Sequence, residues 1–111
     1  MAKEAVWPKD GPEPKGPYSP AIVYNDLVFV SGQGPVDPAT GELVGDDVLD
    51  QMKATMKNID IILKGAGCSL ADVLKVTVYL ADMNDFARMN ELYAQLLAIW
   101  KSGLCRWTAV T

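Results

Sequence analysis

The 111-residue sequence contains no histidine and only two cysteines. Without histidine, the chain has no Ser-His-Asp or Cys-His nucleophile system, no imidazole zinc site and no histidine acid–base chemistry of the ribonuclease type. Two thiols, Cys68 and Cys105, are too few for a disulfide framework or a four-thiolate metal site. Any catalysis by this chain therefore uses carboxylate, tyrosine, lysine, arginine, cysteine or backbone groups.

Positive charge and long apolar runs are also scarce. The chain has 14 acidic against 10 basic residues, a formal net charge of −4, which disfavours nucleic-acid binding because that binding depends on phosphate neutralisation. No apolar run approaches the roughly 20 residues that span a bilayer, and Met1–Glu4 has no apolar signal core. We therefore expect a cytoplasmic protein with reduced thiols and neither a membrane nor a nucleic-acid partner.

Proline is absent after Pro38, since all seven prolines lie within residues 1–38. Because proline continues neither a helix nor a central strand ladder, residues 1–20 are predicted to form an extended arm. Two β-branched and aromatic runs then flank Asn25-Asp26, which predicts a β-hairpin over residues 21–31.

The periodicity changes in the proline-free part of the chain. Apolar residues recur every three or four positions over residues 46–64, which predicts an amphipathic helix ending at glycine. Residues 73–80 alternate between apolar and polar, as in a strand with one wetter face. A second helix is predicted over residues 84–100, and a short last strand over residues 104–111.

The order hairpin, helix, strand, helix, strand predicts one α+β domain over residues 1–111. Two helices would pack on one face of a mixed β-sheet, and the other face would need a cover. For so small a chain, further copies of itself are a natural cover, so we expect an oligomer.

Three segments together carry a family resemblance. They are Gly16–Ala21, the stretch Leu27–Gln33 with the following Asp37–Leu43, and Val76–Met83 with the helix residues Phe86 and Met89–Tyr93. This combination closely resembles the RidA/YjgF family of reactive imine and enamine deaminases, which formerly carried the name endoribonuclease L-PSP. The resemblance runs from about Gly16 to Gln95.

The resemblance implies a chorismate-mutase-like sandwich that assembles as a homotrimer with three clefts between subunits. It implies hydrolysis of 2-iminobutanoate and 2-iminopropanoate, or their enamine tautomers, to 2-oxoacids and ammonia. It also implies that neither a metal nor an organic cofactor is needed. The partners expected are a small 2-imino or 2-oxo acid and two further copies of the chain.

The family motifs map onto six residues of this sequence. Tyr18 is implied to be the catalytic cleft tyrosine, and Arg106 the anchor of the substrate carboxylate, a role for which the guanidinium fork is well suited. The alignment leaves open whether Arg106 or Trp107 occupies the arginine position. The remaining substrate-binding positions are Ser31, Gly32, Gln33 and Asn90. Of these, Asn90 is implied to support the site from nearby.

The sequence after Gln95 departs from the family pattern. The family's last strand carries a glutamate that is implied to activate water, and no counterpart precedes Thr111. A second hypothesis is therefore a trimer that binds small 2-oxoacids, or regulates through them, without catalysis. A third hypothesis is RNA cleavage, which the missing histidine and the negative net charge disfavour.

Overall fold

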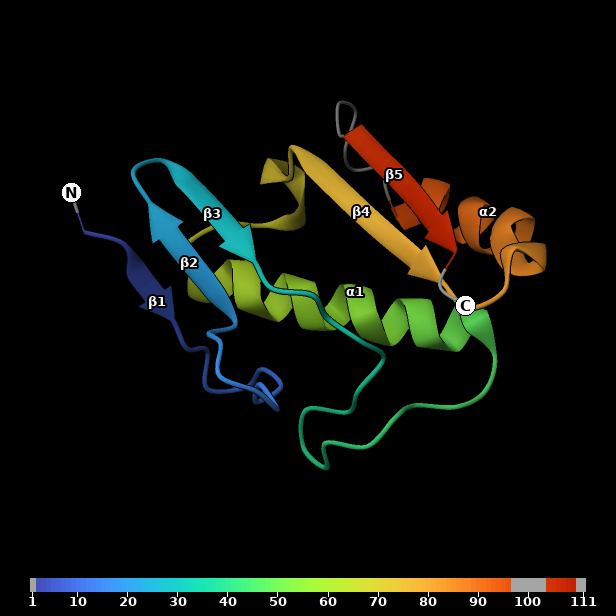
Figure 1. The fold of residues 1–111 in the computed structure, drawn as a ribbon, viewed down its shortest axis with the longest axis horizontal. Helices are drawn as coiled ribbons and strands as arrows, with labels where there is room; N and C mark the ends of the chain where they lie inside the picture. Colours follow the sequence, from blue (N-terminus) through green and yellow to red (C-terminus); the bar gives the residue numbers. More distant parts are fainter. Residues whose placement is uncertain (1, 97–103, 110–111) are drawn as a thin grey trace. The chain divides into compact units, whose positions relative to one another are not determined.

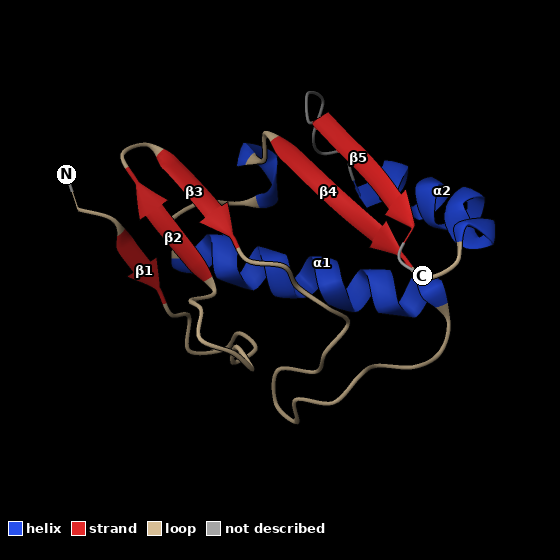
Figure 2. Cartoon of the chain, in the orientation of Figure 1, coloured by secondary structure: helices blue, strands red, loops and turns tan. Residues whose placement is uncertain are grey.

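The computed structural model describes residues 2–96 and the backbone of residues 104–109. These residues belong to two compact units, with the boundary between Ser69 and Leu70. Each unit contains strands and an α-helix (Figure 2).

The first unit contains a three-stranded antiparallel sheet in the order β1-β2-β3 (Figure 1). The strands are β1 (Glu4–Val6), β2 (Ala21–Tyr24) and β3 (Leu27–Val30). The turn between β2 and β3 is the expected one, because Tyr24 pairs with Leu27 and Asn25 adopts a positive φ of 53°. Strand β1 is an addition to the prediction, since it lies within the arm expected to be merely extended.

Helix α1 (Val48–Gly65) packs against this sheet, where it contacts β3 (Figure 1). Its buried apolar residues follow the predicted stripe: Met52, Met56, Ile62 and Leu63. In the sheet, Ala21 of β2 is fully buried. After the helix, Gly67 adopts a φ of +81°, the left-handed conformation predicted for a glycine at this end.

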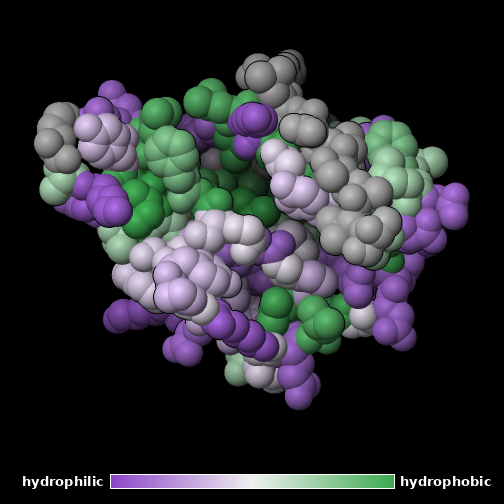
Figure 3. Space-filling view, viewed as in Figure 1, coloured by the Kyte–Doolittle hydropathy of each residue, from purple (hydrophilic) through white to green (hydrophobic). Residues whose placement is uncertain are grey.

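The three-stranded sheet also carries exposed aromatic and aliphatic side chains. Phe29 pairs with Ile22 across the β2–β3 ladder and is 59% exposed, and Tyr24 and Leu27 form a further exposed pair. Trp7, directly after β1, is 61% exposed. Apolar side chains gather over β2 and β3 in the space-filling view (Figure 3). This exposed apolar surface agrees with the uncovered sheet face that the sequence led us to expect.

The second unit contains a parallel pair of strands, β4 (Lys75–Leu80) and β5 (Leu104–Ala109), in register from Lys75↔Leu104 to Leu80↔Ala109. A short 3₁₀-helix, η1 (Leu70–Asp72), precedes β4. Parallel strands need a long crossover connection, and this one contains α2 (Phe86–Leu96). Along β4 the exposure alternates as predicted, with the apolar side inward and the polar side and Tyr79 outward.

Asp82 begins the helical part of this crossover. Its side chain accepts a hydrogen bond from the Asn84 backbone N–H at 2.9 Å and caps η2 (Met83–Asp85), from which α2 continues. Met89 and Tyr93 are the buried residues of α2. The predicted continuation of this helix to residue 100 lies outside the described residues, as do residues 110–111 of the predicted last strand.

Antiparallel and parallel strand pairs together with two α-helices give the mixed α+β class that the sequence predicts. Within the described residues, none of the helices has the length and apolar character required to cross a membrane.

Candidate functional site

The end of the arm lies beside the exit of β3. The Ser31 backbone N–H donates to the Pro20 carbonyl at 2.9 Å, and the Ser31 hydroxyl donates to the Ser19 carbonyl at 2.6 Å. One residue therefore joins the arm to the strand exit through two hydrogen bonds. Two of the sequence motifs, the Tyr18 segment and Ser31–Gln33, are thereby brought together.

A tight turn sets the position of Tyr18. The Tyr18 backbone N–H donates to the Gly16 carbonyl at 2.9 Å, which folds the chain back over Pro17. A Cβ at residue 16 would lie 2.9 Å from the Tyr18 ring carbon Cε1, closer than real Cβ contacts allow. Glycine at this position thus permits the ring to lie over its own turn. The Tyr18 side chain is 47% exposed and accessible to a ligand.

Gly32 and Gln33 have different surroundings. Gly32 is exposed, and a Cβ built on it would meet nothing within 4 Å, so its backbone is open to an approaching molecule. Gln33 is half-buried, and its side-chain Nε2 donates to the Ser31 carbonyl at 3.2 Å. The Gln33 amide therefore folds back on the strand exit and supports it.

The other two predicted site residues belong to the second unit. Asn90 is exposed on α2, next to the buried Met89. Residue 106 is a backbone position in β5 opposite Thr77, while the Arg106 side chain, and with it the choice between Arg106 and Trp107, lies outside the described residues. The first unit thus brings the Tyr18 segment beside Ser31–Gln33, and the site roles of all six residues stay predictions.

The assembled surface offers hydroxyl and amide groups. Tyr18 contributes a phenolic hydroxyl, and Gly32 an exposed stretch of backbone with open space where a Cβ would lie. Residues 18–20 and 31–33 include no cationic side chain. This surface can orient a water molecule and bind polar atoms, and a carboxylate ligand would need a guanidinium from elsewhere.

A buried asparagine supports this region and was missed by the sequence analysis. Asn58 on α1 is 1% exposed and donates from Nδ2 to the carbonyl oxygens of Val36 at 2.7 Å and Gly34 at 3.3 Å. The signal was present in the sequence, because Asn58 precedes the apolar Ile62 by one helical turn and so falls on the buried stripe.

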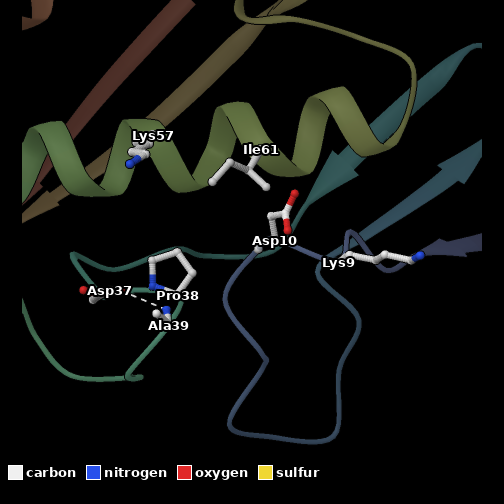
Figure 4. Close-up of a pocket in the computed structure, with 8 residues that line it drawn as sticks. Lys9, Asp10, Asp37, Pro38, Ala39, Lys57 and Ile61 are labelled. Atoms are coloured by element: carbon white, nitrogen blue, oxygen red, sulfur yellow. Dashed lines mark hydrogen bonds between the residues drawn. The ribbon is translucent and has the colours of Figure 1, made fainter.

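A separate pocket of about 470 Å³ lies between the arm, the loop after β3 and α1. Figure 4 shows it bordered by Asp10 on the arm, Pro38 on the loop and Ile61 on α1, and none of the predicted site residues lines it. Its charged side chains are exposed to solvent. Among the described residues, no three metal-binding side chains lie close enough together to hold an ion.

The family is decided by the match of most of the sequence to a family model. The sequence model of the family described as Endoribonuclease L-PSP matches residues 8–110. The chain belongs to this family. A RutC family protein of Pyrococcus abyssi is 54% identical over 95 residues, which cover 86% of this chain and 75% of the relative. A mouse protein named 2-iminobutanoate/2-iminopropanoate deaminase is 46% identical over 93 residues, covering 84% of this chain and 69% of that one.

Solved structures of Endoribonuclease L-PSP relatives confirm the fold. A Rid family protein of Yersinia pestis matches with a TM-score of 0.93 and 33% identity, covering 98% of this chain and 86% of the other. E. coli TdcF with bound serine matches with a TM-score of 0.90 and 35% identity, covering 96% and 85%. The resemblance to the RidA/YjgF family stated from the sequence is therefore confirmed, together with the α+β fold class.

Proposed function

We propose that this chain is an imine/enamine deaminase that hydrolyses small 2-imino acids, such as 2-iminobutanoate and 2-iminopropanoate, to 2-oxoacids and ammonia. The observation that carries the proposal is the pair of hydrogen bonds from Ser31 that hold the Tyr18 segment beside the open backbone of Gly32. Membership of a family that includes proteins named as deaminases of these substrates supports it.

The chemistry requires little from the protein beyond placement. Water adds to the electrophilic carbon of the C=N bond and gives a carbinolamine, which then expels ammonia and leaves the 2-oxoacid. The protein has to hold the carboxylate, place the water and donate or accept protons as charge shifts from nitrogen to oxygen. None of these steps consumes a metal, an oxidant or an organic cofactor.

We assign these tasks to the residues that the sequence singled out. The Arg106 guanidinium holds the substrate carboxylate through two parallel hydrogen bonds. The Tyr18 hydroxyl orients the water, and the Gly32 backbone N–H binds the developing oxygen charge, which the absence of a side chain at Gly32 allows to approach closely. Asn90 supports the site from α2.

The proposal includes a homotrimer with its ligand clefts between subunits. The exposed Trp7, Tyr24, Leu27 and Phe29 of the β1-β2-β3 sheet support it, because apolar surface of this kind is typical of interfaces. Sedimentation velocity at micromolar concentration tests the assembly, and a stable monomer would contradict it. A cytoplasmic location also belongs to this proposal.

The activity is tested by generating the imine in situ with an amino-acid oxidase and trapping it as the semicarbazone. Added protein is expected to lower the semicarbazone yield by competing for the imine. We expect Tyr18→Phe or Arg106→Ala to reduce the rate by about 100-fold or more, as is usual when a proton-handling or charge-stabilising group is removed. Arg88→Ala is the matched control, since Arg88 is the other arginine of the chain and has no assigned role.

Two results would reject the catalytic proposal. One is a rate with protein equal to spontaneous hydrolysis. The other is a protein that binds 2-oxobutanoate in calorimetry and does not hydrolyse the imine. This result would favour the hypothesis of a non-catalytic binding protein. RNA cleavage that persists through repurification and is abolished by Tyr18→Phe would favour the endoribonuclease hypothesis.

A further inference from the structure

Asn58 is a buried polar side chain in the middle of α1, one turn before the fully buried Ile62. Burying an amide is costly unless its polar atoms are hydrogen-bonded. Its Nδ2 group donates to two main-chain carbonyls, Val36 O at 2.7 Å and Gly34 O at 3.3 Å. Because both facing groups are acceptors, only the NH₂ end of the amide fits there, which fixes its orientation.

The two carbonyls bound by Asn58 mark the ends of a tight turn. The Val36 N–H donates to the Gly34 carbonyl at 2.9 Å, so residues 34–36 close a three-residue turn around Pro35. Figure 1 shows the chain running from β3 across α1 in this region. Asn58 therefore ties both ends of this turn to the middle of a long helix.

The segment before this turn has unusual freedom. Gly32 and Gly34 flank Gln33, and neither glycine has a side chain that restricts the backbone. Ser31 fixes the segment at one end through its bonds to Ser19 and Pro20. At the other end, Asn58 attaches the turn to α1, while the bridge of Val36 with Leu43 attaches it to its own loop. The open backbone of Gly32 lies between these two ends.

We infer that Asn58 is a positioning residue for the candidate site: from α1 it holds the Gly34–Val36 turn and so fixes the backbone of Gly32 and Gln33 for ligand binding. The part of this inference that concerns the ligand rests on the proposed function. The part that concerns the backbone does not, because the hydrogen bonds alone carry it.

Amide hydrogen exchange tests the backbone part without any ligand. Asn58→Leu has a similar volume and no donors, and Asn58→Ser is a smaller polar variant in case leucine prevents folding. We expect exchange at Val36 and Asp37, whose N–H groups are hydrogen-bonded, to become roughly tenfold faster, the effect of losing about one net hydrogen bond. Exchange at Ser31, whose N–H donates to Pro20, should change less.

Met52→Ala is the matched control, because Met52 is a buried apolar residue of the same helix. It is expected to lower the melting temperature and leave exchange at Val36 and Asp37 unchanged relative to the remaining protected amides. The inference would be overturned if amide exchange at these residues were accelerated equally in Met52→Ala and in the Asn58 variants. It would also be overturned if exchange were not accelerated in the Asn58 variants.

Calorimetry with 2-oxobutanoate separates this inference from the proposed function. If Asn58 positions the site, the Kd rises about tenfold in the Asn58 variants, matching the exchange effect, and is unchanged in Met52→Ala. Unchanged affinity in variants with accelerated exchange would overturn the ligand part. If the natural sequence itself fails to bind, the proposed function is wrong while the exchange result still decides the positioning role.

Discussion

Both units join distant parts of their chain through strand ladders, and the first unit adds side-chain hydrogen bonds that hold its loops. In the first unit, side chains reach main-chain carbonyls far along the sequence: Ser31 to Ser19, Asn58 to Val36, and Lys15, whose Nζ lies 2.7 Å from Gly41 O. In the described part of the second unit, a backbone ladder joins β4 to β5 across a crossover that contains α2. Loops of the first unit thus have side-chain hydrogen bonds in addition to the backbone bonds within them, such as the bridge of Val36 with Leu43.

This difference determines where a substitution has local consequences. A strand ladder shares its energy over many backbone bonds, so a side-chain change there acts mainly through packing. A loop has fewer such bonds, so removing one amide or one hydroxyl that holds it loosens the loop locally. The assembled part of the candidate site lies in the first unit, so its precision depends on few residues.

The largest expected effects test whether the two units unfold as one. Ile62→Ala in the first unit and Met89→Ala in the second each remove a buried side chain, and each is expected to cost about 2–5 kcal/mol of unfolding free energy. Because the sequence predicts one domain, both should shift the same urea transition, followed by circular dichroism and tryptophan fluorescence. Two separate transitions would contradict that prediction, and the exposed Lys53→Ala serves as the control.

The next effect comes from backbone strain at the end of α1. Gly67 has a φ of +81° and open space where a Cβ would lie, so Gly67→Ala adds strain without a clash. We expect a loss of about 1–2 kcal/mol, measured by urea unfolding. Gly32→Ala, with equal space and no positive φ, should stay within about 0.5 kcal/mol of the natural sequence. Equal losses in the two variants would show that φ is not the cause.

The Asp82 cap in the second unit is expected to contribute somewhat less to the free energy of unfolding, through a hydrogen bond and not through backbone strain. Asp82→Ala removes the acceptor of the Asn84 N–H at the start of η2 and is expected to cost about 1 kcal/mol. Asp82→Asn keeps an acceptor oxygen and should restore most of the stability in thermal unfolding. Failure of asparagine to restore it would assign the effect to charge rather than to the hydrogen bond.

The smallest effect belongs to the surface of α1. Lys64 and Asp60 form an ion pair of 2.8 Å one helical turn apart, with the lysine largely exposed. Such pairs contribute about 0.3–0.5 kcal/mol, so Lys64→Ala should change the melting temperature by little, and less still in high salt. A loss well above about 1 kcal/mol would indicate a further role for Lys64.

The sequence predicted those elements whose signal is local. The Asn25-Asp26 turn, the stripe of α1 and the alternation of β4 all follow from residues close together in the chain. Strand β1 was not predicted, because Glu4–Val6 is short and becomes a strand by pairing with Ala21–Val23, far along the sequence. At the start of β4 the predicted strand was two residues too long, since the observed strand begins at Lys75.

The candidate site was likewise predicted where its residues lie in sequence motifs, and was missed where a residue acts through distant partners. The motif residues Tyr18, Ser31 and Gly32 were identified from a resemblance, and the structure brings their segments together through the Ser31 hydrogen bonds. Asn58 was not identified, since its role depends on carbonyls 22 and 24 residues away. A periodicity argument detects a polar residue on an apolar stripe, and it does not reveal which carbonyls face that residue.

The buried Asn58 amide on α1 also limits how far this sequence can be engineered for a more stable helix. Leucine at position 58 would make α1 a better helix by intrinsic propensity and would continue its apolar stripe. The same change would remove the two hydrogen bonds that attach the Gly34–Val36 turn to α1. Engineering this chain for helix stability alone would therefore select against the geometry beside Gly32, a local trade-off between robustness and function.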